Sequence, residues 1–220
     1  MNRRQRLYQF DYIGRRSAVV LYGQMVKDVL RECPNARVLD VGCGHGEWRY
    51  LFPVPAQYTG LDVVSRPGVS VVASAEKMPL PDNSFDLIFC NAVPEHIPDV
   101  RSAMSEMWRV LRQDGVLILG THGVWPIHGE PHDYRRWTPY GLKWECGKFR
   151  TCEVRQLGGP WMNLMCIANC YLRNLQEKSR LLRVMIAPLV LLNNCLGMLF
   201  PGRSSSPATF AVLYVLRATK

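Results

Sequence analysis

The feature that most constrains the fold is a short apolar segment followed at once by three glycines. Residues 38–41 read Val-Leu-Asp-Val, and glycine then recurs at positions 42, 44 and 46. The apolar residues predict a buried strand, and the glycines predict a tight turn whose backbone N–H groups face a ligand. A helix is expected to begin within residues 47–52. Glu47 stands where the G-x-G-x-x-G fingerprint requires glycine, so the turn favours a ligand without a run of phosphates.

A second strand that ends in a carboxylate follows about twenty residues after this turn, at the spacing at which doubly wound sheets hold an acid for a ribose diol. Residues 58–64 read Tyr-Thr-Gly-Leu-Asp-Val-Val, which places that acid at Asp62. Later apolar runs predict strands at 69–74, 85–91 and 116–121, and helical spacing predicts helices at 17–31 and 99–112. Strands that alternate with helices predict an α/β fold with a parallel sheet.

These motifs, in this order, resemble the class I S-adenosylmethionine-dependent methyltransferases, and in particular their type 11 branch. The resemblance covers residues 36–142 and rests on V-L-D-V-G-C-G-H-G, G-L-D, the segment 74–86, and L-R-x-D-G-V-L-I-L at 111–119. It implies a Rossmann-like, seven-stranded, mostly parallel sheet with a C-terminal antiparallel hairpin strand. Residues 151–157 and 209–216 are expected to supply the last two strands.

The chain is expected to form a single methyltransferase domain with an apolar helical insert before its last strand. We divide it into an N-terminal arm and helix (1–35), a cofactor-binding core (36–157), the insert (158–207) and the last strand (208–220). Tyr8, Phe10 and Tyr12 in the arm are interpreted either as part of a frayed segment or as part of a lid over the site.

Residues 181–200 in the insert are strongly apolar but are interrupted by Arg183, Pro188 and two asparagines. Three interpretations stay open, namely a membrane span, a helix lying in the bilayer interface, and a buried cap or dimer face. The basic flanks favour a cap beside the substrate that also contacts a membrane.

Charge and cysteine content limit the partners and the compartment. The formal net charge of +9 favours an acidic partner such as anionic lipid, an acidic glycan or nucleic acid. Because much of the charge lies towards both ends of the chain, a membrane surface fits at least as well as a nucleic acid. The eight cysteines form no CxxC pair, so we expect reduced thiols and no metal site. No secretory signal is recognised, and the expected location is cytoplasmic, with peripheral contact at the inner membrane face.

The resemblance implies S-adenosylmethionine as the cofactor and assigns residues to it. Asp40 and the backbone of two glycines in the turn are expected to hold the methionine part, Asp62 the ribose hydroxyls, and Val63 the adenine. Ser74 departs from the acid that many relatives have for the adenine amine, so that contact is expected to pass to the next two residues. The expected cofactor-binding residues are Asp40, Gly42, Cys43, Gly44, Asp62, Val63, Ala75, Glu76 and Asn91.

A second distinctive segment occupies residues 125–142. It resembles the P-x-H…P-x-D-Y-x-R-[WF]-T-P-x-G-L segment of bacterial methyltransferases found with surface-glycan or lipid-linked saccharide synthesis. Thr138-Pro139 is expected to cap a helix, with Thr at the cap and Pro in the first turn. The remainder is expected to be the acceptor loop, because it follows the fifth strand at the edge where open α/β sheets bind ligands.

Histidines in this loop suit proton transfer from an alcohol nucleophile. His128 or His132 is the expected general base, with Asp133 orienting it. His96, in the segment after the fourth strand, is interpreted either as a base or as a residue that holds its loop by hydrogen bonds. A polar loop held by internal salt bridges is the structural alternative for the whole segment. The expected substrate-binding residues are Tyr134, Arg135, Arg136 and Trp137.

The sequence therefore predicts a methyltransferase whose acceptor is an oxygen of a small molecule, a glycan or a lipid-linked saccharide. An RNA methyltransferase is one alternative, favoured by the basic charge. Against it, Asn91-Ala92-Val93-Pro94 differs from the N-P-P-Y motif of enzymes that methylate base amines, and no RNA-binding module is recognised before the core. The other alternative is a catalytically silent, methyltransferase-like binding protein, which the intact glycines and Asp62 oppose.

Overall fold

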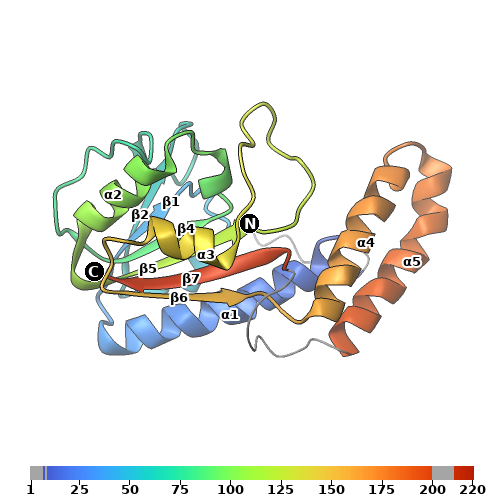
Figure 1. The fold of residues 1–220 in the computed structure, drawn as a ribbon, viewed down its shortest axis with the longest axis horizontal. Coiled ribbons are helices and arrows are strands. Elements are labelled where there is room, and N and C mark those ends of the chain that lie inside the picture. The colour runs from blue at the N-terminus through green and yellow to red at the C-terminus, as the bar shows by residue number, and fades with distance from the viewer. Residues whose placement is uncertain (1–6, 8, 200–210) are drawn as a thin grey trace.

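The computed structural model describes residues 7, 9–199 and 211–220, which form a seven-stranded sheet with helices on both faces (Figure 1). The strands are β1 (Arg37–Val41), β2 (Gln57–Asp62), β3 (Val71–Val72), β4 (Phe85–Asn91), β5 (Leu111–His122), β6 (Thr151–Gln156) and β7 (Leu213–Thr219). The helices are α1 (Tyr12–Glu32), α2 (Val100–Val110), α3 (Pro139–Glu145), α4 (Pro160–Gln176) and α5 (Arg180–Leu199), with 3-10 turns η1 (Arg49–Leu51) and η2 (Pro94–His96).

The strand order is β3-β2-β1-β4-β5-β7-β6, with β1 to β5 parallel and β7 antiparallel between β5 and β6. This confirms the predicted fold class. The central strands are near-continuous apolar runs because helices cover both faces of the sheet. Val41 pairs with Leu61 and Cys90, and Asn91 pairs with Gly120. The carboxyl ends of β1, β2, β4 and β5 therefore meet at one edge.

Two hydrophobic cores lie on opposite faces of the sheet. One face packs against α2 and α3, with Ile88 and Leu117 among its strand residues. The other packs against α1 and α4, where Tyr22 lies edge-on to Phe89 and Trp48 at centroid distances of 5.1 and 5.2 Å. Burial of these large apolar side chains is the main favourable term in folding.

The prediction that a helix begins within residues 47–52 is wrong, because the structure has only the single 3-10 turn η1 there. Gly46 has a φ of +71° and Pro53 follows η1, so too few residues lie between them to offset the cost of helix nucleation. Trp48 instead fills the space between α1 and β4. Elsewhere α1 begins at Tyr12, earlier than predicted, and the expectations for the first part of the arm, the 201–207 linker and residues 209–210 lie outside the described residues.

The insert forms an antiparallel pair of helices, α4 and α5, that projects beyond the end of the sheet (Figure 1). Asn169 donates to the side-chain oxygen of Asn194 at 2.9 Å, and Asn193 donates back to Asn169 at 3.2 Å. Asn194 also donates to the carbonyls of Leu7 and Gln9. The asparagines that interrupt the apolar run therefore face α4 and the N-terminal segment.

Asn163 fixes the base of this helical pair, and its removal is expected to destabilise the fold. Its buried amide donates to the carbonyls of Leu157 and Gly159 at 3.2 and 2.9 Å and accepts from the N–H of Val212 at 2.9 Å. Asn163→Ala leaves these buried groups without partners, so we expect a loss of about 3 kcal/mol in the free energy of unfolding, measured by urea denaturation. The matched control Asn174→Ala, at an exposed position of α4, should change it by less than about 0.5 kcal/mol. Equal effects of the two variants would contradict this role.

Candidate active site at the carboxyl edge of the sheet

A cavity of about 520 Å³ opens at the ends of β1 and β2, within the size range of small-molecule sites. Gly42 and Gly44 line it, with φ angles of +69° and +55°. A side chain at position 42 is excluded, because its Cβ would lie 2.2 Å from a methyl group of Val93. The N–H groups of Gly42 and Cys43 both donate to the carbonyl of Leu61. The prediction that they face a ligand is therefore wrong, and the turn is fastened to the end of β2.

Asp62 lies at the wall of this cavity, where the sequence places it. One carboxylate oxygen accepts from the N–H of Gly44 and the other from the N–H of Val64, both at 2.9 Å. Each oxygen keeps acceptor capacity for a further donor, because a carboxylate has about four lone-pair sites. The arrangement suits a pair of ligand hydroxyls, and exposed Val63 adds apolar surface beside it.

The opposite wall of the cavity contains Ser74, Ala75 and Glu76. Ser74 donates to the Glu76 carboxylate at 2.9 Å and accepts from the Glu76 N–H at 3.2 Å. The other Glu76 oxygen accepts from the N–H of Asp99 at 2.8 Å. The glutamate is thus held in place at the cavity wall, next to the serine that departs from the family pattern.

Three residues expected to bind the cofactor do not line this cavity. Asp40 is buried, its carboxylate accepts from the Tyr58 hydroxyl at 2.7 Å, and burial raises its pKa to about 7. Cys43 is buried beneath the turn. Asn91 accepts from the hydroxyl of Tyr22 at 2.5 Å and faces a different cavity.

This second cavity is smaller, about 200 Å³, and lies between α1, the glycine turn, β4, β5 and α4. Its wall includes Arg15, Trp48, His122 and Cys166. Ala92 lines both cavities, so the two adjoin at the end of β4. The smaller cavity therefore lies directly beside the larger one.

The charged residues of the 125–142 loop mainly hold the loop together. Arg136 donates to both Asp133 oxygens, at 2.5 and 2.7 Å, and to the carbonyls of Trp125 and Pro126. Arg135 donates to the carbonyls of Ile97 and Pro98. The prediction that these arginines bind an acidic substrate group is corrected, since their donors are engaged within the protein, as in the salt-bridged alternative.

The other expected loop residues have different positions. His132 and Tyr134 line the larger cavity, and the His132 Nδ1 lies 2.8 Å from the Tyr134 hydroxyl. Trp137 packs against the core, with its indole nitrogen buried. The Asp133 carboxylate accepts from the backbone N–H of His128 at 2.9 Å. The hydrogen bond to Arg136 is the main reason that the pKa of Asp133 is well below its usual range. Thr138 caps α3 as expected, accepting from the Gly141 N–H at 3.1 Å.

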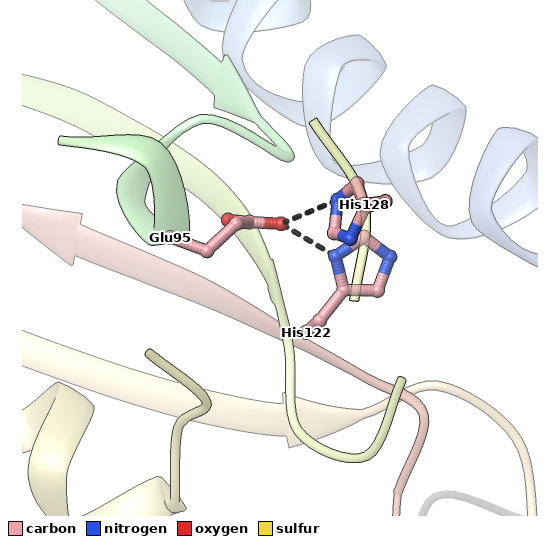
Figure 2. A group of neighbouring side chains, drawn as sticks. All are labelled: Glu95, His122 and His128. Atoms are coloured by element: carbon pink, nitrogen blue, oxygen red, sulfur yellow. Dashed lines mark hydrogen bonds and ion pairs between the residues drawn. The ribbon is translucent and has the colours of Figure 1, made fainter. Parts of the chain in front are cut away.

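The structure brings together a group that the sequence does not predict, Glu95 with His122 and His128 (Figure 2). Glu95 is fully buried, and its carboxylate lies 2.5 Å from His122 Nδ1, 3.9 Å from His128 Nε2 and 2.7 Å from the Thr121 hydroxyl. These residues are far apart in the chain and have no recognisable spacing. The sequence signal is that each lies at or after the end of a strand that ends at this edge.

The electrostatics of the group favour a charged carboxylate and a neutral imidazole. Burial by itself raises the pKa of Glu95, but the hydrogen bond and charge of His122, with smaller backbone and Thr121 contributions, lower it below its ordinary value overall. Burial lowers the pKa of His128, and the neighbouring rings of His122 and His96 lower it further. The hydrogen bond to the Pro126 carbonyl raises this pKa but does not offset the other effects. A neutral histidine beside an ionised glutamate is therefore expected near neutral pH.

Comparisons with known proteins agree with this architecture. A family model described as "Methyltransferase domain" matches residues 39–119. The chain is 37% identical over 117 residues to the uncharacterized methyltransferase YcgJ of Bacillus subtilis, covering 46% of each chain. It is 38% identical over 107 residues to the malonyl-[acyl-carrier protein] O-methyltransferase of Methylococcus capsulatus, covering 41% of this chain and 38% of that one. The chain thus spans less than half the length of these curated relatives.

Among solved structures, a SAM-dependent methyltransferase of Thermotoga maritima, described as a possible histamine N-methyltransferase, superimposes with a TM-score of 0.56. It has 18% sequence identity, and the alignment covers 96% of this chain and 97% of that one. Fold and site together define a class I methyltransferase domain. Residues 39–119 of the chain are a methyltransferase domain of the type 11 branch of the class I S-adenosylmethionine-dependent methyltransferases.

The residues of the larger cavity fit the cofactor of this family. The Asp62 carboxylate offers acceptors for ribose hydroxyls, and the side-chain-free backbone at Gly42 and Gly44 allows close approach. The turn presents Glu47 rather than a third fingerprint glycine, which suits a cofactor without phosphates.

Asp62→Ala is expected to weaken binding of S-adenosylhomocysteine, because two hydroxyl hydrogen bonds are lost at the cavity wall. Calorimetric titration should show a loss of about 1–3 kcal/mol, or roughly 5- to 150-fold in Kd. Asp28→Ala, at a partly exposed α1 residue paired with Arg31, is the matched control and should leave the affinity unchanged. Unchanged affinity in Asp62→Ala, with its fold intact by circular dichroism, would exclude this role.

Proposed function

We propose that the protein transfers a methyl group from S-adenosylmethionine to an oxygen of an acceptor held in the smaller cavity. The observation that carries this proposal is that the cavity walled by Asp62 adjoins a second cavity at Ala92. Methyl transfer requires donor and acceptor to be held in line and in near contact. Two adjoining cavities at the carboxyl edge of the sheet meet that requirement.

When bound, S-adenosylmethionine supplies an electrophilic methyl group, whose bond to sulfur breaks as the acceptor oxygen bonds to its carbon and gives up a proton. The protein supplies position and exclusion of water. Asp62 and the glycine turn fix the larger ligand, while α1 and α4 close the smaller cavity on its far side. His122, whose Nδ1 is held by Glu95, also lines the smaller cavity, so an imidazole lies next to the acceptor.

The nature of the acceptor atom is the finer part of the proposal. A relative is named as an O-methyltransferase, and an imidazole at the cavity wall suits loss of a proton from a hydroxyl. RNA methylation is the alternative, and it requires an extended basic surface beside the site. Arg135 and Arg136, the two arginines of the 125–142 loop, are engaged within the protein instead.

A substitution that fills the smaller cavity is expected to block transfer without affecting cofactor binding. Gly14 lines that cavity, and a Cβ added there would meet only Cys166 Sγ, at 3.6 Å. In Gly14→Leu, transfer of labelled methyl to a membrane and glycan extract should fall at least about tenfold, or about 1.4 kcal/mol. Affinity for S-adenosylhomocysteine should be unchanged. Val20→Leu, at a solvent-exposed position of α1, is the control. No transfer by the unaltered protein to any extract, with S-adenosylhomocysteine binding retained, would favour a silent binding protein.

We also propose that α5 lies on an anionic membrane surface and that the acceptor comes from there. Exposed apolar residues recur along one face of α5 at helical spacing, at Leu181, Val184, Met185, Leu189 and Leu192. The opposite face, with buried Ile186 and Val190, packs against α4. The helix is long and apolar enough to cross a membrane by length and composition. Its packing on α4 along one side favours an interfacial position over a span.

Charge supports an anionic lipid partner. Lys178, Arg180 and Arg183 are exposed at the start of α5, beside the apolar face. A helix with an apolar face and flanking cations binds the boundary between headgroups and acyl chains. Because α4 also walls the smaller cavity at Cys166, an acceptor with a lipid tail can reach the site from this surface.

Replacing the apolar face of α5 is expected to abolish binding to vesicles. The triple variant Leu181→Gln, Met185→Gln and Leu189→Gln should sediment with phosphatidylglycerol vesicles at least about tenfold less than the unaltered protein, since each apolar side chain contributes about 1.5–3 kcal/mol when buried. Its thermal stability should be preserved, because these side chains are exposed. Val20→Gln on exposed α1 is the control. If the unaltered protein does not bind vesicles and is a dimer in solution, and the triple variant is a monomer, then α5 is a dimer face instead.

A further inference from the structure

Metal-binding side chains from three separate segments converge between the two cavities. Glu95 comes from η2, His122 from the end of β5, and His128 from the loop that follows. One ligand atom from each lies within 4.8 Å of the others. Figure 2 shows that both imidazoles present a nitrogen to the same oxygen of Glu95. The set contains two imidazole nitrogens and one carboxylate oxygen, donors that first-row transition metals accept.

A third imidazole, that of His96, approaches the set with a lone pair. His96 Nδ1 bonds to the carbonyl of His132, and His128 Nδ1 lies 3.2 Å from the carbonyl of Pro126. Because a carbonyl only accepts, each of these Nδ1 atoms must carry the proton. In neutral rings both Nε2 atoms then have lone pairs, and they face one another at 3.2 Å. Two lone pairs at this distance repel unless a cation or a shared proton lies at them.

The residues around this set orient it by hydrogen bonds, as the residues around the ligands of a metal ion do. His96 and His128 each donate a hydrogen bond from Nδ1 to a backbone carbonyl, which fixes the tautomer and the orientation of the ring. Histidines that bind metal ions are commonly held in this way. The Thr121 hydroxyl holds the other Glu95 oxygen at 2.7 Å. Trp125 stacks on the ring of His122 at a centroid distance of 5.0 Å. The fully buried carboxylate of Glu95 supplies anionic charge of the kind that a dication requires.

We propose that Glu95, His122 and His128 bind a transition-metal dication, for which the donor set favours Zn²⁺. Three protein ligands leave one coordination position open, as in catalytic zinc sites. Binding takes the Nδ1 lone pair of His122, so the proton now shared between Nδ1 and Glu95 moves to Nε2 and the ligand stays a neutral imidazole. It also uses the Nε2 lone pair of His128, which removes the repulsion with His96. His96 Nε2 then remains as an acceptor beside the open position.

The position of the site gives the ion a possible task, and this part rests on the proposed methyl transfer. His122 lines the smaller cavity and His96 lines the larger one. An ion between them stands at the junction, where a hydroxyl acceptor would lose its proton. A dication held there would lower the pKa of a coordinated oxygen.

This inference reverses an expectation from the sequence. Cysteine spacing predicts no metal site, and all eight cysteines are free in the structure. The proposed ligands include no cysteine and are separated by 27 and 6 residues along the chain, so they form no local sequence motif. Only the pairing of β4 with β5 brings η2 beside the end of β5.

The test is direct metal binding by the full chain, prepared without a histidine tag and stripped with a chelator. Titration with Co²⁺ should give visible d–d absorption bands that saturate at one ion per chain, and one equivalent of Zn²⁺ should remove them. Zn²⁺ should also raise the melting temperature. In His128→Ala and in Glu95→Gln, affinity should fall at least about 100-fold, more than the loss of an outer-shell contact. His45→Ala, at an exposed position of the glycine turn, is the matched control and should bind as the unaltered protein does.

Two results would overturn the proposal. One is the absence of stoichiometric Co²⁺ or Zn²⁺ binding by the folded protein, which would leave a shared proton between His96 and His128. The other is equal metal affinity in His128→Ala, Glu95→Gln and His45→Ala, which would place any bound ion elsewhere. Calorimetry with S-adenosylhomocysteine on the same samples separates the two proposals. Cofactor binding without metal binding removes only the metal site, whereas metal binding without cofactor binding removes the proposed methyl transfer.

Discussion

The parallel pairing of β1 with β2 and with β4 is the constraint on which the site depends. The register places Val41 beside Leu61 on one side and Cys90 on the other, so three strands end together. The glycine turn is then close enough for its amides to bond to Leu61 and for Gly44 to donate to Asp62. A slip of one residue would turn alternate side chains to the other face and remove these contacts. The cavity wall is therefore a consequence of strand register more than of any single residue.

The charged residues of the loop after β5 fix the conformation of that loop. Asp133 and Arg136 form a nearly buried ion pair whose remaining donors and acceptors are used by the backbone. Such a pair gives little net stability, because desolvation offsets the attraction, but it fixes a geometry. Here it holds the segment that presents His128 to Glu95. The buried glutamate is satisfied by His122 and Thr121, so η2 and the end of β5 are joined through one carboxylate.

The helical pair α4–α5 joins the wall of the smaller cavity to the exposed apolar face of α5, which we propose contacts a membrane. Buried asparagines bind α4 to α5 and to the N-terminal segment, while the apolar face of α5 stays outside the packing. An exposed apolar stripe of this kind is unusual on a soluble protein and marks a binding surface. Because Cys166 of α4 lines the smaller cavity, one insert carries both the exposed apolar face and part of the wall of that cavity.

The sequence by itself determined the fold class and the meeting of the glycine turn with Asp62 at one edge of the sheet. Apolar runs predict the strands, and apolar residues at helical spacing predict the helices. The glycines and Asp62 predict the cavity wall. These predictions succeed because each signal is local in the chain. It failed at residues 47–52, where Gly46 and Pro53 leave no room for a helix, and at the loop arginines, whose partners lie in distant segments. Only the tertiary structure decided that Asp40 faces Tyr58 and that Glu95 meets His122 and His128. Such contacts depend on strand order and register, which join residues that share no local pattern.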